Sequence, residues 1–190
     1  VQKMARENKI MSAEQAVAHI KNGDRIMVGG FGLRGAPDPL VEALVKTGVK
    51  DLTIISNDLA SPHIGLGQLL DNKMVKGCIG NYYNWNKDAV AAYYAGELPI
   101  TLIHQGTFIE AIRADAYGIP EFYTPTGYGT DLAEGHETRE FNGRGYILQE
   151  ALHAEVALVK AYKADKLGTL IFYKTARNFN PTKAMAAAYT

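Results

Sequence analysis

Cysteine is almost absent from this sequence, and neither sign of charge is in excess. The 190 residues include a single cysteine, Cys78, so no internal disulfide can form and a reducing compartment is expected. Cys78 lies in the apolar run 74–79, where packing in the core is the expected role. Basic and acidic residues each number 20, which gives a formal net charge of zero. This balance disfavours a nucleic-acid partner, because such proteins usually carry a basic excess.

Long hydrophobic runs are also lacking. No apolar stretch approaches the ~20 residues that span a bilayer, so no membrane partner is expected. Residues 1–9 are polar and lack the apolar core of a signal peptide, which favours a cytoplasmic protein. Apolar residues make up 47% of the chain and charged residues 21%, as in an ordinary globular protein. We expect a single domain over residues 1–190.

Several familiar catalytic patterns are missing. The sequence has no G-x-S-x-G motif, so acyl transfer on a serine has no support. The histidines are scattered, and none makes a ligand pair at tight spacing with another histidine, a cysteine or an acidic residue, so no metal site is expected. The five histidines are His19, His63, His104, His136 and His153.

What the sequence does contain is an alternation of short apolar strands and amphipathic helices. Strands are predicted over residues 26–28, 52–56, 75–79 and 99–103. Helices are predicted over residues 12–21, 37–48, 65–70, 87–95 and 107–116. Ser12 and Gln15 form a capping box for the first of these helices, and Thr107 and Glu110 are expected to cap the last. This order indicates an α/β fold with a mostly parallel sheet flanked by helices.

The second half of the chain has a different character. Residues 118–130 are rich in proline and glycine and predict an irregular, functional loop. Residues 140–148 predict a β-hairpin around the Asn142-Gly143 turn. Extra strands are expected over residues 155–160 and 169–173.

The most informative segment is the glycine-rich turn at residues 29–36. It follows a predicted strand and precedes a helix that begins near Pro37, and it contains G-x-G-x-x-G at Gly30, Gly32 and Gly35. One interpretation is a dinucleotide-dependent oxidoreductase with a pyrophosphate on the helix N-terminus and Asp58 on the ribose. Against it, Pro37 removes one amide donor, and the long loop at 118–130 is left without a purpose.

Three ordered motifs resemble those of the family I CoA-transferases, specifically the A (alpha) subunit of the 3-oxoacid or acetoacetate type. In residues 22–37 the pattern is Asn-Gly, two free positions, three apolar residues, Gly-Gly-Phe, three free positions, Gly, one free position and Pro. The segment from Gln105-Gly106-Thr107 to Gly129-Thr130 is similar to the family's central block, and residues 174–181 are similar to its C-terminal block. The resemblance runs from about residue 12 to residue 188.

The resemblance implies that CoA moves from an acyl-CoA to a short carboxylate or 3-oxoacid by a ping-pong route. Gln105 would donate its amide to the thioester oxyanion, although a polar residue at a helix entrance is an alternative interpretation. Asn57 would lie in the pocket, and a turn-forming role is the alternative there. The pocket would also include Gly29, Gly30, Phe31, Gly32 and Gly35.

The resemblance also implies a partner. The nucleophilic glutamate of this family belongs to the B (beta) subunit, so no nucleophile is assigned in this chain and a hetero-oligomer is expected. Coenzyme A is a substrate, and no metal, nicotinamide or other cofactor is implied. A third interpretation is a non-catalytic module that binds CoA or an acid.

Some positions depart from the family pattern. Asp115 and Tyr117 stand where relatives usually have glycines and could reshape a loop beside the pocket. The aromatic patch 82–85 could be core, subunit interface or substrate wall. Family members continue past the alanine-rich segment into another strand, whereas this sequence stops at Thr190.

Overall fold

The computed structural model describes residues 8–190. The expectation about a signal peptide concerns residues 1–9 and therefore falls almost wholly outside the described part. Within residues 8–190, no helix has the length and apolar character needed to cross a membrane.

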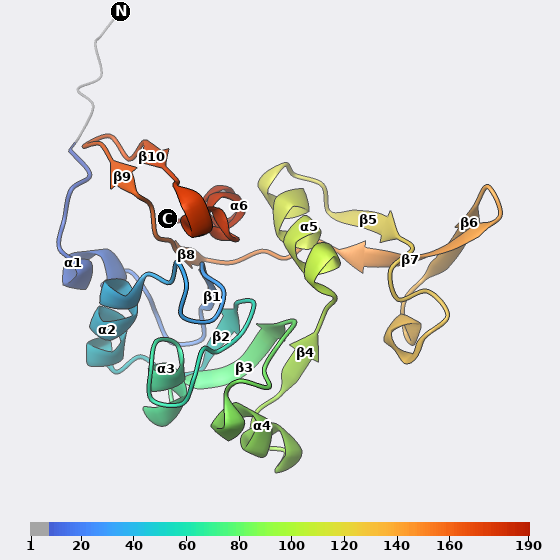
Figure 1. Ribbon diagram of the computed structural model, residues 1–190, viewed down its shortest axis with the longest axis horizontal. Coiled ribbons are helices and arrows are strands. Elements are labelled where there is room, and N and C mark those ends of the chain that lie inside the picture. The colour runs from blue at the N-terminus through green and yellow to red at the C-terminus, as the bar shows by residue number, and fades with distance from the viewer. Residues whose placement is uncertain (1–7) are drawn as a thin grey trace, which may run out of the picture.

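A five-stranded parallel sheet forms the centre of the molecule (Figure 1). Its strands are β1 (Arg25–Val28), β2 (Leu52–Ile55), β3 (Val75–Gly80), β4 (Ile100–Leu102) and β8 (Val156–Leu158). They pair in the order β4-β3-β2-β1-β8, and every pair is parallel. The helices are α1 (Ala13–Val17), α2 (Asp38–Thr47), α3 (Gly67–Asp71), α4 (Lys87–Tyr94), α5 (Gln105–Ala116) and α6 (Asn180–Ala186).

Both faces of this sheet are covered, because successive strand residues point to opposite sides. In β1, Ile26 and Val28 pack with α1, α2 and α3 on one face. Met27, between them, packs with α5 and α6 on the other face. All three side chains are fully buried, as expected for a central parallel strand. The α/β fold predicted from the sequence is confirmed.

A second, antiparallel sheet projects to one side of the molecule, beyond α5 (Figure 1). Its strands β5 (Glu121–Thr124), β7 (Arg144–Glu150) and β6 (Thr138–Phe141) lie in that order. The hairpin between β6 and β7 turns at Asn142 and Gly143, both at positive φ, as the Asn-Gly prediction requires. A small pair, β9 (Lys163–Ala164) and β10 (Leu170–Ile171), and the 3₁₀ turns η1 (Asp131–Ala133) and η2 (Lys174–Arg177) complete the chain.

Three local predictions were wrong. Helix α5 begins two residues before Thr107, with His104 at the N-cap, and Glu110 pairs with Arg113. The irregular loop predicted at 118–130 contains β5, because residues 121–124 pair with β7, a contact that no local pattern reveals. Helix α1 has the predicted capping box but ends at Val17, one turn earlier than expected.

The sheet continues beyond β8. After α6 the backbone returns to the edge of the sheet, where Tyr189 forms a parallel bridge with Val156. The Ala157 amide donates to the Tyr189 carbonyl at 2.8 Å, and the Tyr189 amide donates to Glu155 at 3.0 Å. The residues that follow the alanine-rich helix therefore extend the parallel sheet.

Candidate active site

The glycine turn follows β1, and its backbone amides are held by the protein itself. Gly29 N–H donates to the Leu158 carbonyl of β8 at 2.9 Å. Phe31 and Arg34 exchange two backbone hydrogen bonds of 2.9 Å, which closes a tight turn between them. Gly32 N–H donates to Asp58 Oδ2 at 2.8 Å. Amides bonded in this way are not available to a pyrophosphate, which weakens the dinucleotide interpretation.

Gly30 and Gly32 of the turn are required by conformation and by space. Gly30 has φ +111° and Gly32 has φ +55°, backbone conformations that residues with a side chain rarely adopt. A Cβ on Gly32 would lie 2.7 Å from Cζ3 of Trp85. The indole of Trp85 can therefore lie directly against the backbone only because this position lacks a side chain.

A chain of hydrogen bonds joins the turn to the end of β2 and the start of α5. Asp58 accepts from Gly32 N–H and also from the Asn57 amide, whose Nδ2 lies 2.6 Å from Asp58 Oδ2. Gln105 Nε2 in turn donates to Asn57 Oδ1 at 2.9 Å. Asp58 Oδ1 accepts from Ala60 N–H at 2.7 Å. The structure thus brings together Asn57, Gln105 and the turn, the three parts predicted from the sequence.

This chain of bonds fixes the orientation of the Gln105 side chain. Asn57 is fully buried and Asp58 nearly so, so neither can turn away without leaving a buried polar group unpaired. The Gln105 carboxamide carries two N–H donors, and one is bonded to Asn57. Because Gln105 is exposed at the first position of α5, its second donor remains accessible to a ligand.

The C-terminal motif, residues 174–181, holds the glycine turn through hydrogen bonds from two asparagines. Asn178 Nδ2 donates to the Arg34 carbonyl, and Asn180 Nδ2 donates to the Gly35 carbonyl, each at 3.0 Å. Asn180 Oδ1 accepts from Lys160 N–H at 2.8 Å. A Cβ on Gly29 would overlap this carboxamide. The α-carbon of Gly29 is therefore packed against Asn180, a role that the sequence analysis did not anticipate.

Aromatic rings form an exposed wall beside the turn. The ring centroids of Phe31 and Trp85 lie 5.6 Å apart, and those of Trp85 and Tyr82 lie 5.1 Å apart, both edge to face. Phe31, Tyr82 and Trp85 are 37%, 41% and 46% exposed, whereas Tyr83 between them is buried. Burial raises the pKa of the Tyr83 hydroxyl well above its ordinary value. The patch 82–85 is thus divided between a surface wall and the core.

Two cavities flank β4. The larger, of about 420 Å³, lies between β4, the start of α5 and the antiparallel sheet, and is bordered by His104 and Thr107. The smaller, of about 210 Å³, is bordered by tyrosines that include Tyr82 and Tyr83. Apart from the aromatic patch 82–85, one of whose expected roles is a substrate wall, none of these lining residues was predicted from the sequence to border a cavity. The larger cavity could not be predicted from local sequence, because it forms only where β5 and β7 fold back toward β4.

The two residues that depart from the family pattern lie away from Gln105. Asp115 is in the last turn of α5 and bonds His153 Nδ1 at 3.0 Å. The guanidinium of Arg113 lies 5.4 Å from the centroid of the exposed Tyr117 ring. Gln105 begins the same helix, so about 15 Å of helix separates them. The expectation that Asp115 and Tyr117 reshape the pocket is not supported by this placement.

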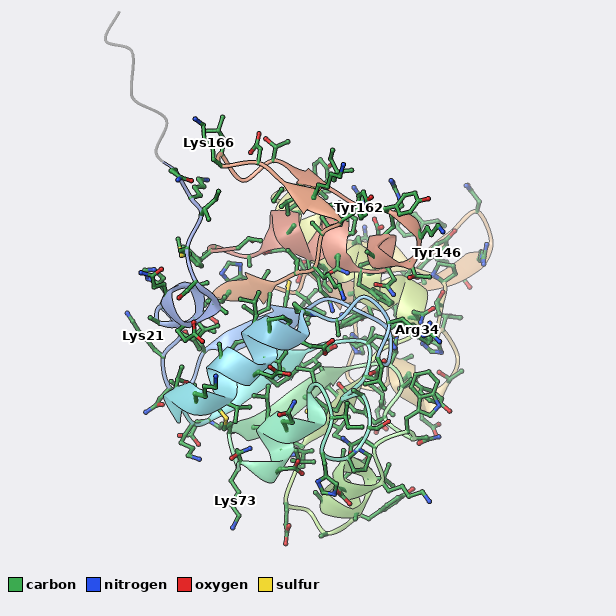
Figure 2. The ribbon with its side chains drawn as sticks, turned by 60° about the vertical axis from the view of Figure 1, so that its left-hand side comes forward. Lys21, Arg34, Lys73, Tyr146, Tyr162 and Lys166 are labelled. Carbon is green, nitrogen blue, oxygen red and sulfur yellow. The ribbon has the colours of Figure 1, made fainter. Side chains whose placement is uncertain are left out.

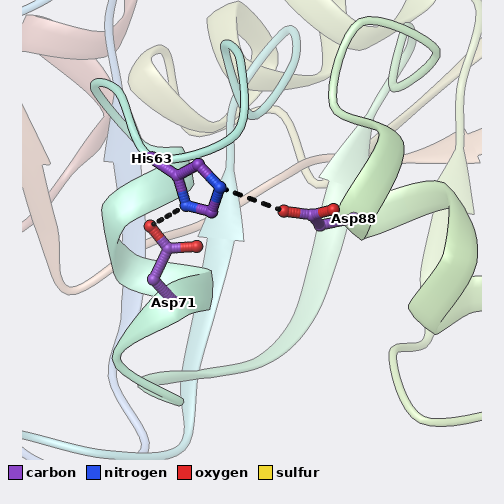
Figure 3. A group of neighbouring side chains, drawn as sticks. All are labelled: His63, Asp71 and Asp88. Atoms are coloured by element: carbon purple, nitrogen blue, oxygen red, sulfur yellow. Dashed lines mark hydrogen bonds and ion pairs between the residues drawn. The ribbon is translucent and has the colours of Figure 1, made fainter.

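His63 lies between two acidic residues, an arrangement that sequence spacing did not predict. Figure 3 shows His63 between Asp71 of α3 and Asp88 of α4, with Nδ1 3.1 Å from Asp71 and Nε2 4.0 Å from Asp88. One ligand atom from each residue lies within 4.8 Å of the others. The two carboxylates approach different nitrogens of one exposed ring, an arrangement that suits ion pairing with a protonated imidazole.

Cys78 is buried in β3. Burial raises the pKa of its thiol to about 12, so the nucleophilic thiolate does not form at neutral pH. The predicted core role agrees with this position.

The fold, the turn and the oriented carboxamide together define a class of protein. Residues 10–190 match the family described as Coenzyme A transferase, and the chain belongs to that family. Within it the chain is an alpha-type subunit, as the names of its relatives show.

Two curated relatives illustrate the likeness. The chain is 48% identical over 181 residues to the A-type subunit of a succinyl-CoA:3-ketoacid coenzyme A transferase of Helicobacter pylori, covering 95% of this chain and 78% of that one. It is 46% identical over 178 residues to the A-type subunit of a 3-oxoadipate CoA-transferase of Pseudomonas putida, covering 93% and 77%. These relatives give no support to the oxidoreductase interpretation.

Solved structures agree on the fold. Glutaconate coenzyme A-transferase from Acidaminococcus fermentans superposes with a TM-score of 0.80 at 22% identity, covering 96% of this chain and 65% of that one. A variant of the decarboxylase AibA/AibB superposes with a TM-score of 0.76 at 27% identity, covering 94% and 71%. Since this fold is also found in a protein described as a decarboxylase, the reaction has to be argued from the site.

Proposed function

We propose that this chain, together with a beta subunit, transfers CoA from an acyl-CoA to a short-chain carboxylate or a 3-oxoacid. The observation that carries the proposal is the Gln105 carboxamide, oriented by Asn57 at the carboxyl edge of the sheet with a free N–H donor. Ligands of open α/β sheets bind at this edge. Names of relatives that include succinyl-CoA, 3-ketoacid and 3-oxoadipate support the substrate class.

In the proposed reaction a glutamate that the beta subunit supplies attacks the thioester carbonyl. The thioester C–S bond breaks, so that CoA leaves as a thiolate and an acyl-glutamyl anhydride is formed. The thiolate then attacks the glutamyl carbonyl, releasing the first carboxylate and leaving a glutamyl-CoA thioester. The acceptor carboxylate reverses these steps. Dividing one exchange into several covalent steps is how a weak nucleophile becomes effective.

Gln105 acts on the negative charge that develops on the thioester oxygen. Its second N–H donates to this oxygen, and the hydrogen bond that Gln105 donates to Asn57 Oδ1 prevents the carboxamide from rotating away. A preorganised donor of this kind contributes about 3–4 kcal/mol of transition-state stabilisation. In the proposed complex, the turn from Gly29 to Gly35 and the exposed ring of Phe31 form the wall that faces the acyl group.

The finer properties belong to the same proposal. The active form is a hetero-oligomer of this chain with a beta subunit, which the naming of the relatives as one of two subunit types supports. It acts in the cytoplasm, with coenzyme A as substrate and without a separate cofactor or metal. Its partners are the acyl-CoA and the acid, without nucleic acid or membrane.

Reconstitution tests the proposal directly. The chain is co-purified with a beta subunit encoded beside it, and CoA exchange is followed between acetoacetate or 3-oxoadipate and succinyl- or acetyl-CoA. We expect exchange with parallel-line, ping-pong kinetics. A stable complex that turns over none of these pairs would overturn the proposal, and tight NAD binding by the isolated chain would revive the oxidoreductase alternative.

A further inference from the structure

Lys183 of α6 is buried beneath the glycine turn, although lysine side chains are rarely buried in proteins. Its side chain is completely buried, whereas every other lysine in residues 8–190 is exposed. Figure 2 shows the usual arrangement, with Lys21, Lys73 and Lys166 extending from the surface. Burying an amine is costly unless its N–H groups are paired, so the contacts of Lys183 need an explanation.

The contacts of Lys183 are with the last carbonyls of two adjacent strands. Nζ donates to the Val28 carbonyl at 2.6 Å and to the Ile55 carbonyl at 3.3 Å. Val28 directly precedes the glycine turn, and Ile55 lies two residues before Asn57. Ser56 Oγ also donates to the Val28 carbonyl, at 3.2 Å. The amine therefore ties β1 to β2 at the point where both chains leave the sheet to form the site.

Two aromatic rings enclose the amine. The centroids of Phe108 of α5 and of Phe179 each lie 5.3 Å from Nζ. Ring faces stabilise a cation, while the two carbonyls match the two N–H donors of a neutral amine. Burial lowers the pKa of Lys183 from its ordinary value of 10.5 to about 7, against an opposing effect of Asp58. Both protonation states therefore keep the two hydrogen bonds.

Asp58 is the charged group that acts on Lys183. Helix α6 packs against α5, β1, β8 and η2. None of the charged side chains on these elements is buried. They are Arg25, Glu110, Arg113, Asp115, Lys174 and Arg177. Asp58 itself holds Gly32 and Asn57, so Lys183 and the site share one buried carboxylate.

We propose that Lys183 is a positioning residue of the acyl-CoA site, which clamps the ends of β1 and β2 and thereby sets the glycine turn relative to Asn57 and Gln105. The proposal rests on the proposed function for its catalytic consequence. Its structural part, the clamp on the turn, does not depend on which substrate is used.

Lys183→Met tests the clamp, because methionine fills a similar volume without a donor. Lys183→Gln is the conservative variant that retains two N–H donors, and Lys21→Met is the control for loss of an exposed lysine. In the complex with the beta subunit we expect Lys183→Met to lower kcat about tenfold with KM for acyl-CoA within about twofold, since orientation matters most in the transition state. Lys183→Gln should recover most of kcat.

A substrate-free measurement separates this proposal from the proposed function. Amide hydrogen exchange of the full chain should accelerate about tenfold over residues 29–36 in Lys183→Met, with residues 138–150 unchanged. The wild type should also gain stability relative to Lys183→Met from pH 7 to about pH 10. In that range the unfolded lysine holds a proton that the folded one has released.

Wild-type exchange at residues 29–36 in Lys183→Met, or a wild-type kcat in its assembled complex, would overturn the proposal. If Lys183→Met does not fold, Lys183→Gln is compared with Lys21→Met by kcat in the complex and by amide exchange at residues 29–36. Equal values for these two variants in both measurements support the clamp. Altered exchange in a complex that shows no CoA transfer would instead contradict the proposed function and leave the clamp standing.

Discussion

The parallel and antiparallel sheets are stabilised in different ways. Strands β1 and β8 of the parallel sheet are buried almost throughout, and Phe108 of α5 packs against their face without exposure to solvent. All four residues of β6 in the antiparallel sheet are exposed. Its rings pack edge to face at the surface, with the centroids of Tyr123 and Phe141 5.2 Å apart and the Arg139 guanidinium near both rings.

The difference shows why the candidate site lies where it does. Gln105, Asn57 and the glycine turn all start from elements whose other faces are buried, so their positions are determined by a close-packed core. In the antiparallel sheet Ile147 and Thr124 are buried, whereas most of the other strand residues are exposed or half-buried. Groups that must be held to a fraction of an ångström belong on the first sheet.

Phe108→Ala should have the largest effect on stability. The side chain is fully buried between the sheet and α6, so its removal loses apolar burial and leaves a cavity. We expect a loss of about 3–5 kcal/mol in the free energy of unfolding. Denaturant titration of the isolated chain measures it, and a loss below about 1 kcal/mol would show that this core is not close-packed.

Asp58→Ala should come second. It leaves the amides of Gly32 and Ala60 and the Asn57 carboxamide without their acceptor in a buried site. We expect a loss of about 2–3 kcal/mol, measured in the same titration, with Glu42→Ala on the exposed face of α2 as the control. Equal stability of the two variants would mean that the hydrogen-bond chain does not hold the turn.

Phe141→Ala should have the smallest effect, although it is the same substitution as Phe108→Ala. Phe141 is 39% exposed and contacts Tyr123 and Tyr146 edge to face. Its loss should cost about 1 kcal/mol. A cost as large as that of Phe108→Ala would remove the distinction between the two sheets.

The sequence predicted the parallel sheet well because each of its strands is a local apolar run. The resemblance to the CoA-transferases assigned Gln105 and Asn57 to one site, and in the structure the two residues follow the parallel strands β4 and β2 at one edge of the sheet. Three features depend on long-range contacts and could not be predicted locally: the pairing of residues 121–124 with β7, the packing of Asn180 under Gly29, and the burial of Lys183.

The turnover number of Gln105→Ala in the complex with a beta subunit measures what the Gln105 carboxamide contributes to CoA transfer. Gln15→Ala on α1 is the matched control, because it removes the same side chain from an exposed position where its hydrogen bonds are with Ser12. We predict that kcat falls ~10²–10³-fold in Gln105→Ala, with the complex intact and the control unchanged. An unchanged kcat in an intact Gln105→Ala complex would show that Gln105 does not stabilise the thioester oxyanion.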